Sequence, residues 1–116
     1  MQVLTTDEKD VIVIHLHGRI TGVQDSDDFH NVIESVLKSD FKKAVLDIKG
    51  VDWMNSTGLA LLVRAYTQLN EAGCKLHVAG ASPAVQTVLR TTKLDSVFGL
   101  FPNVAEAAED LRKRDK

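Results

Sequence analysis

The feature that most constrains this chain is the alternation of short β-branched runs with stretches whose apolar residues recur at helical spacing. Continuous apolar runs are typical of buried strands, and the spacing i, i+3, i+4, i+7 is typical of amphipathic helices. A weak strand is expected near Val3, and stronger strands are predicted over residues 11–16, ending at Gly18, and over residues 44–48, 75–79 and 97–101.

Four helices are predicted between and after these strands, each with its own start or stop signal. The first, which buries Phe29 and Ile33, has Asp25 or Ser26 available as its N-cap. The others are a second helix from about Leu59 that closes at Gly73, a third that begins at Ser82-Pro83, and a last one in which Asn103 and Glu106 resemble a capping box.

This order of elements predicts an α/β fold. Strands that alternate with helices imply right-handed crossovers on a mixed, largely parallel sheet, here of four to five strands with about four helices. A chain of 116 residues suits one compact core that buries roughly two-thirds of the unfolded surface. We therefore expect residues 1–116 to form a single domain.

Composition excludes several classes of function. A net charge of −2 provides no positive field for a polyphosphate backbone, so nucleic-acid binding is not expected. The single cysteine, Cys74, is unable to form an intramolecular disulfide or a thiolate cage, which suits a packing role in a reducing compartment. No export signal or apolar stretch of about 18 residues is present, which favours a cytoplasmic protein without a membrane partner.

The most unusual segment leads from the second strong strand into the second helix. Asn55, Ser56 and Thr57 precede Gly58, and any one of the three suffices to cap the helix. At least one hydroxyl is thus expected to be free, at a helix N-terminus that tolerates a phosphate well, with Gly58 leaving the approach open. From spacing alone, the alternative is that these are turn and cap residues without a further role.

Residues 47–59, Asp-Ile-Lys-Gly-Val-Asp-Trp-Met-Asn-Ser-Thr-Gly-Leu, resemble the signature of STAS domains, in particular the free-standing anti-sigma factor antagonists. That family carries an aspartate at the end of an inner strand, which Asp47 matches, and then Asp-Ser-Ser/Thr-Gly-Leu at the start of the second helix. The order of elements is also similar over nearly the whole chain. This sequence departs from the pattern at Asn55, where the family usually has an acidic residue.

The resemblance implies a switch. In the family, a partner that is both anti-sigma factor and ATP-dependent serine kinase phosphorylates the serine that Ser56 matches. The unmodified protein binds that kinase and frees the sigma factor. The phosphorylated form dissociates from the kinase until a PP2C-type phosphatase removes the phosphate. The resemblance also implies a docking surface that includes the loop before the first helix, with Thr21, Asp25, Asn55, Ser56, Thr57 and Gly58 as its expected residues.

Two other functions are open at this stage. A STAS-type interaction module in a transport or signalling assembly would act without phosphorylation, and Asn55 favours it because an amide has no charge to guide a kinase. A small serine hydrolase would need a base beside Ser56, but no Gly-x-Ser-x-Gly elbow surrounds that residue. We therefore expect neither enzymatic activity nor a cofactor.

Three further groups of residues bear on binding. His15 and His17 share one face of a strand, but no third ligand is close in sequence, so no metal site is predicted. The acidic residues from Asp25 to Asp28 are better explained by helix initiation than by cation binding. Trp53 would be a partner anchor if exposed, and a buried position is equally compatible with the sequence.

Overall fold

A computed structural model of the protein describes residues 2–21 and 26–113. Within them lies one sheet in the order β1-β2-β3-β4-β5, with β1 antiparallel to β2 and the other neighbours parallel. The strands are β1 (Gln2–Glu8), β2 (Val11–Ile20), β3 (Lys43–Met54), β4 (Lys75–Ala79) and β5 (Gly99–Phe101). The helices are α1 (Ser26–Lys38), α2 (Ser56–Glu71), α3 (Pro83–Thr91) and α4 (Val104–Lys113), with a 3-10 turn, η1 (Leu94–Ser96). The predicted α/β fold is confirmed.

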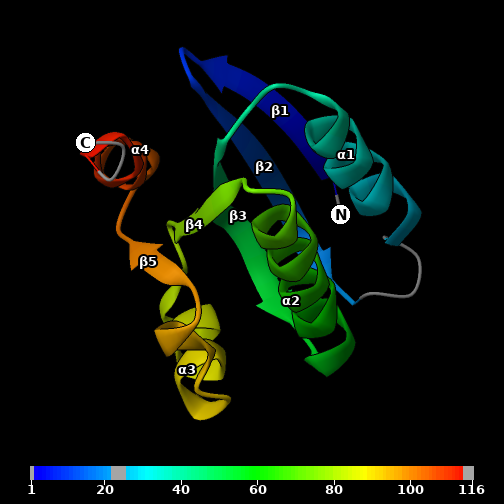
Figure 1. Ribbon diagram of the computed structural model, residues 1–116. Helices are drawn as coiled ribbons and strands as arrows, with labels where there is room; N and C mark the ends of the chain where they lie inside the picture. Colours follow the sequence, from blue (N-terminus) through cyan, green and yellow to red (C-terminus); the bar gives the residue numbers. More distant parts are fainter. Residues whose placement is uncertain (1, 22–25, 114–116) are drawn as a thin grey trace.

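The helices cover the two faces of the sheet unequally. α1 and α2 pack on one face, and α4 lies across the sheet from them (Figure 1). The large core forms under α1, α2 and α3, where alternate strand residues such as Ile14, Leu46 and Val78 are buried. Ala107, Ala108 and Leu111 of α4 cover the opposite face. Among the described residues, no helix has the length and hydropathy needed to cross a membrane.

Two strands are longer than predicted, and one is shorter. β2 continues through Gly18 to Ile20, because Gly18 adopts a φ of 98° within an irregular stretch instead of ending the strand. β3 continues past residue 48 to Met54, so Asp47 is not the end of a strand. The predicted strand over residues 97–101 begins only at Gly99, because the N–H of Val97 bonds to the carbonyl of Leu94 in a tight turn.

The predicted helix signals are confirmed where the structure describes them. Gly73, with a φ of 83°, follows α2 directly after Ala72. The hydroxyl of Ser82 accepts a hydrogen bond from the N–H of Val85 at the start of α3. The side chain of Asn103 accepts from the N–H of Glu106 at the start of α4. These local signals fix where the helices begin and end.

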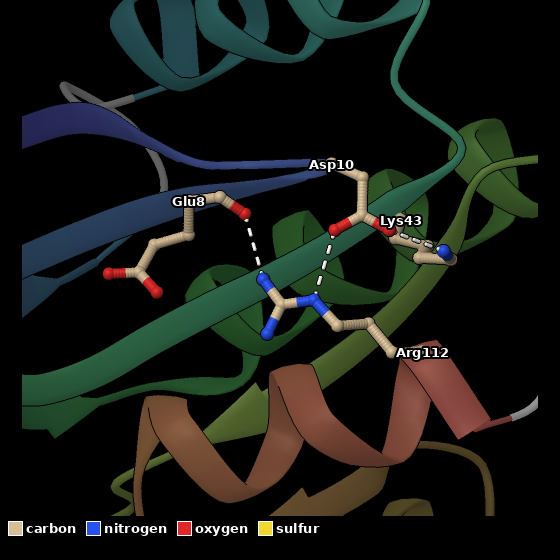
Figure 2. Close-up of polar contacts among 4 residues, drawn as sticks. All are labelled: Glu8, Asp10, Lys43 and Arg112. Carbon is tan, nitrogen blue, oxygen red and sulfur yellow. Dashed lines mark hydrogen bonds and ion pairs between the residues drawn. The ribbon is translucent and has the colours of Figure 1, made fainter.

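A polar cluster fastens α4 to the turn between β1 and β2. Figure 2 shows the Asp10 carboxylate between two cations, 2.6 Å from Lys43 Nζ and 3.0 Å from Arg112 Nε. Arg112 also donates to the carbonyl of Glu8. Hydrogen bonds from Lys43 and Arg112 hold the pKa of Asp10 well below its usual range. The C-terminal helix α4 is thereby joined to the β1–β2 turn, and that turn to the start of β3.

Candidate functional site

Ser56 is the first residue of α2 and is exposed. The N-cap is Asn55, whose side-chain oxygen accepts a hydrogen bond of 2.8 Å from the N–H of Gly58. Of the three possible caps, the amide is therefore the one used. Thr57 is also exposed, and neither hydroxyl has a hydrogen-bond partner among the described residues. The expectation of a free hydroxyl at this helix N-terminus is confirmed.

The start of α2 is held against the end of β2. The N–H of Asn55 bonds to the carbonyl of Ile20 at 3.3 Å. Gly58 is buried at the same place, and a Cβ on it would lie 2.2 Å from that carbonyl oxygen. Our expectation that Gly58 opens the approach to Ser56 was therefore wrong, because this glycine allows close packing beneath the site.

The electrostatics of this helix end suit an anion. The first turn of α2 contains no acidic residue, so its unpaired N–H groups and the positive end of its dipole are not neutralised from within the helix. A phosphate on the Ser56 hydroxyl would lie next to these groups. The site can thus accept a phosphoryl group without a conflict of charge inside its own helix.

The loop before α1 is only partly described. Thr21 is half-buried and directly follows Ile20, the residue that contacts Asn55 and Gly58, so the structure brings Thr21 close to the start of α2. Asp25 lies outside the described residues. Asp27 and Asp28 are exposed in the first turn of α1, as expected of residues that favour helix initiation.

Asp47 belongs to a different part of β3. Its carboxylate accepts hydrogen bonds from His15 Nδ1 at 2.8 Å and from the N–H of Lys49 at 3.1 Å. Met54 is seven positions further along this extended strand, which is about 23 Å at ordinary strand rise. Asp47 therefore fastens β3 to β2 and does not contact the exposed serine.

His15 and His77 have side-chain hydrogen-bond partners other than Ser56. Thr6 Oγ1 lies 2.9 Å from His15 Nε2, so both ring nitrogens of His15 are hydrogen-bonded. His77 Nε2 lies 2.7 Å from a carboxylate oxygen of Asp110. No three His, Cys, Asp or Glu side chains gather as ligands within residues 2–21 and 26–113. In the same residues, no hydrogen bond joins a histidine to Ser56.

Comparison with known families shows which family of domains this chain belongs to. Residues 2–107 match the STAS domain. The chain belongs to the STAS domain family. The resemblance drawn from residues 47–59 is therefore confirmed, and the free hydroxyl of Ser56 stands at the start of the second helix of a STAS domain.

Relatives with names that mention sigma-factor control match this STAS domain over nearly its whole length. An anti-sigma F factor antagonist from Paenibacillus polymyxa is 21% identical over 111 residues, which are 96% of this chain and 95% of that protein. A crystal structure of an anti-sigma factor antagonist from Mycobacterium paratuberculosis has a TM-score of 0.85 and 25% identity, covering 96% of this chain and 93% of that one. The antagonist SpoIIAA in its unphosphorylated form has a TM-score of 0.79 at 15% identity, covering 97% of each chain.

Sequence reasoning left the exposure of Trp53 open, and it missed Arg19, which contacts this tryptophan beside the start of α2. Trp53 is 46% exposed, and the guanidinium of Arg19 lies 5.4 Å from the centroid of its ring. Arg19 and Trp53 are paired across β2 and β3 only because the register shifts between Gly18 and Arg19. Alternation along a strand does not reveal such a shift, so the sequence holds no signal for this cation–π contact.

Cys74 has the packing role that the sequence predicted. The residue is buried directly after α2, and burial raises the pKa of its thiol to about 11. A thiol in this state is a poor nucleophile at neutral pH. Cys74 therefore adds no second reactive group to this STAS domain.

Proposed function

We propose that this protein is a cytoplasmic anti-sigma factor antagonist that phosphorylation of Ser56 switches off. It binds an anti-sigma factor that is also an ATP-dependent serine kinase, and this binding frees the sigma factor. Phosphorylation then ends the binding, and a PP2C-type phosphatase reverses it. The observation that carries the proposal is the exposed Ser56 hydroxyl, which the cap leaves free because Asn55 fills that role.

Similarity supports the class of partner. The relatives named above match nearly the whole length of this chain, and the match covers nearly the whole of each relative. Their names therefore refer to proteins of the same size and architecture. The histidine pairs and the buried thiol supply no catalytic group at Ser56, which supports a role as a kinase substrate and binding protein instead of a catalyst.

The physical basis of the switch is charge. A phosphoserine adds about −1.5 to −2 charges at neutral pH. The first turn of α2 accommodates this charge, so the fold itself has no reason to change. A partner surface formed around a neutral hydroxyl would instead incur desolvation and repulsion, and a loss of about 3 kcal/mol weakens binding on the order of a hundredfold.

Asn55 supplies the helix cap that the proposed switch requires. The amide caps α2 as an aspartate would, since its oxygen accepts the bond from Gly58. Unlike an aspartate, Asn55 places no negative charge beside the Ser56 hydroxyl that would receive the phosphate. Asn55→Asp therefore keeps the cap and restores the acidic residue of the family pattern, which isolates the contribution of that charge to kinase recognition.

The experiment is phosphorylation in vitro followed by mass spectrometry. The chain is incubated with ATP and a kinase of the histidine-kinase-like ATPase superfamily encoded beside its own gene. We expect one added phosphoryl group, mapped to Ser56, absent from Ser56→Ala and retained in Thr57→Ala, which removes the adjacent exposed hydroxyl as a matched control. A label on Thr57, or no label on the wild-type chain, would contradict the switch and favour a STAS module that binds without phosphorylation.

A further inference from the structure

The last residues of β2 and β3 alternate between the two faces of the sheet. Ile20 and Met54 are buried in the large core beneath α1, α2 and α3. Their neighbours Arg19 and Trp53 therefore point to the opposite face, where both side chains are exposed. The helix α4 also packs on that face, but against residues near the beginnings of β2 and β3 (Figure 1). The face is thus open at the end of the sheet where α2 begins.

Arg19 and Trp53 form a stacked pair on this open face. The guanidinium of Arg19 lies 5.4 Å from the centroid of the indole ring, which is within the range of a cation–π contact. The contact restricts both side chains before any partner binds, so less conformational entropy is lost on binding. Trp53 nevertheless keeps 46% of its surface exposed to water. Tryptophan and arginine are the residue types that most often dominate the binding energy of an interface.

We propose that this stacked pair is an anchor for the anti-sigma factor that phosphorylates Ser56. The inference rests on the proposed function, and it adds a contact beyond the hydroxyl residues and the loop before α1. Trp53 fills an apolar depression of the partner, and Arg19 pairs with a carboxylate beside that depression. The partner surface that fits the pair is therefore an apolar pocket with an acidic residue at its rim.

The position of the stacked pair selects this occupant. Trp53 precedes Ser56 by three residues, so their Cα atoms are at most about 11 Å apart. A stable interface buries about 800 Å² on each protein, which corresponds to a round patch with a radius of about 16 Å. A kinase that holds Ser56 near the centre of its contact therefore reaches Trp53 as well. One partner thus covers the phosphorylation site and the stacked pair together.

The charges at this end of the sheet favour an acidic partner surface. The first turn of α2 contains no acidic residue, and Arg19 adds a cation on the neighbouring strand. Asp52 is exposed beside Trp53, but among the described residues it forms no ion pair with Arg19, which stays available to a partner. An acidic residue held by Arg19 also lies near a phosphate on Ser56. Repulsion between these two anions contributes to release of the phosphorylated form.

The test measures binding to the kinase of the phosphorylation experiment, with ADP in place of ATP so that no phosphoryl group is transferred. Trp53→Ala should weaken binding at least about thirtyfold, and Arg19→Ala about tenfold. Trp53→Phe keeps an aromatic ring and should recover most of the loss. Val97→Ala is the matched control, because Val97 is 41% exposed but precedes β5, at the opposite end of the parallel strands from Ser56. It should bind as the wild type does, and far-UV circular dichroism verifies that all variants are folded.

Phosphorylation kinetics distinguish an anchor from a residue that acts on phosphoryl transfer. An anchor changes affinity, so Trp53→Ala should raise the KM for this chain and leave kcat nearly unchanged. Wild-type affinity of Trp53→Ala, or an equal loss in Val97→Ala, would overturn this inference and leave the switch at Ser56 in place. A wild-type chain that does not bind the kinase would overturn both proposals.

Discussion

Replacing Gly58 with alanine tests whether close packing positions the start of α2. A Cβ on Gly58 would lie 2.2 Å from the carbonyl oxygen of Ile20 and 2.8 Å from Cγ2 of the same residue, whereas ordinary contact begins at 3.4 Å. The first turn of α2 must therefore move by about 1 Å, away from the end of β2. That movement strains the bond from the N–H of Asn55 to Ile20.

The expected cost follows from opposing effects. Alanine favours a helix interior over glycine by about 1 kcal/mol, so without a clash the variant would be more stable. Overpacking costs about 1–3 kcal/mol, and each weakened hydrogen bond costs about 0.5–1.5 kcal/mol. We expect Gly58→Ala to lose about 2 kcal/mol in free energy of unfolding, which lowers the melting temperature by roughly 6–10 °C.

Urea unfolding followed by the fluorescence of Trp53, the single tryptophan, measures this loss close to the site. Gly73→Ala is the matched control, because nothing lies within 4 Å of a Cβ there and its φ of 83° is the only source of cost. Gly58→Ala should also slow phosphorylation of Ser56, and Gly73→Ala should not. A Gly58→Ala variant as stable as the wild type would refute the packing argument.

Two further predictions concern the Asn55 cap and the polar cluster around Asp10. Asn55→Ala removes the acceptor of the Gly58 N–H and should lower the free energy of unfolding by about 1 kcal/mol in the same urea assay, while Asn55→Asp should be near neutral. Because Lys43 and Arg112 depress the pKa of Asp10 in the folded state, its contribution to stability is present above its ordinary pKa of 3.8 and is lost as the pH falls through and below that value. Thermal melts at pH 7 and pH 3 should therefore show a smaller loss of stability in Asp10→Asn than in the wild type, and an equal loss would count against this role.

Much of the fold follows from local residue patterns. Ser82, Gly73 and Asn103 mark helix ends by hydrogen bonds within a few residues, so the sequence predicts them correctly. The predicted ends of β2 and β3 were wrong for different reasons. Gly18 was interpreted as a strand end, whereas it lies within an irregular stretch of paired strand. The strand over residues 44–48 was ended with its apolar run, whereas β3 continues to Met54. Local sequence does not distinguish a break from a bulge.

The candidate site was also predictable only where local sequence determines it. The cluster of Asn55, Ser56 and Thr57 indicates a helix start with a spare hydroxyl, but not which of the three is the cap. Contacts between distant residues leave no local pattern. Arg112 and Asp10 are 102 residues apart in the chain, and their ion pair arises only when α4 docks against the β1–β2 turn.

The central claim is tested most directly by the affinity of the chain for its anti-sigma factor before and after phosphorylation of Ser56. Isothermal titration measures the affinity of the unmodified protein, the phosphorylated protein and Ser56→Ala. The comparison separates the effect of the added charge from the effect of losing the hydroxyl alone. The account predicts binding weakened on the order of a hundredfold by the phosphate and little changed by the alanine. Equal affinities of the modified and unmodified forms would contradict it.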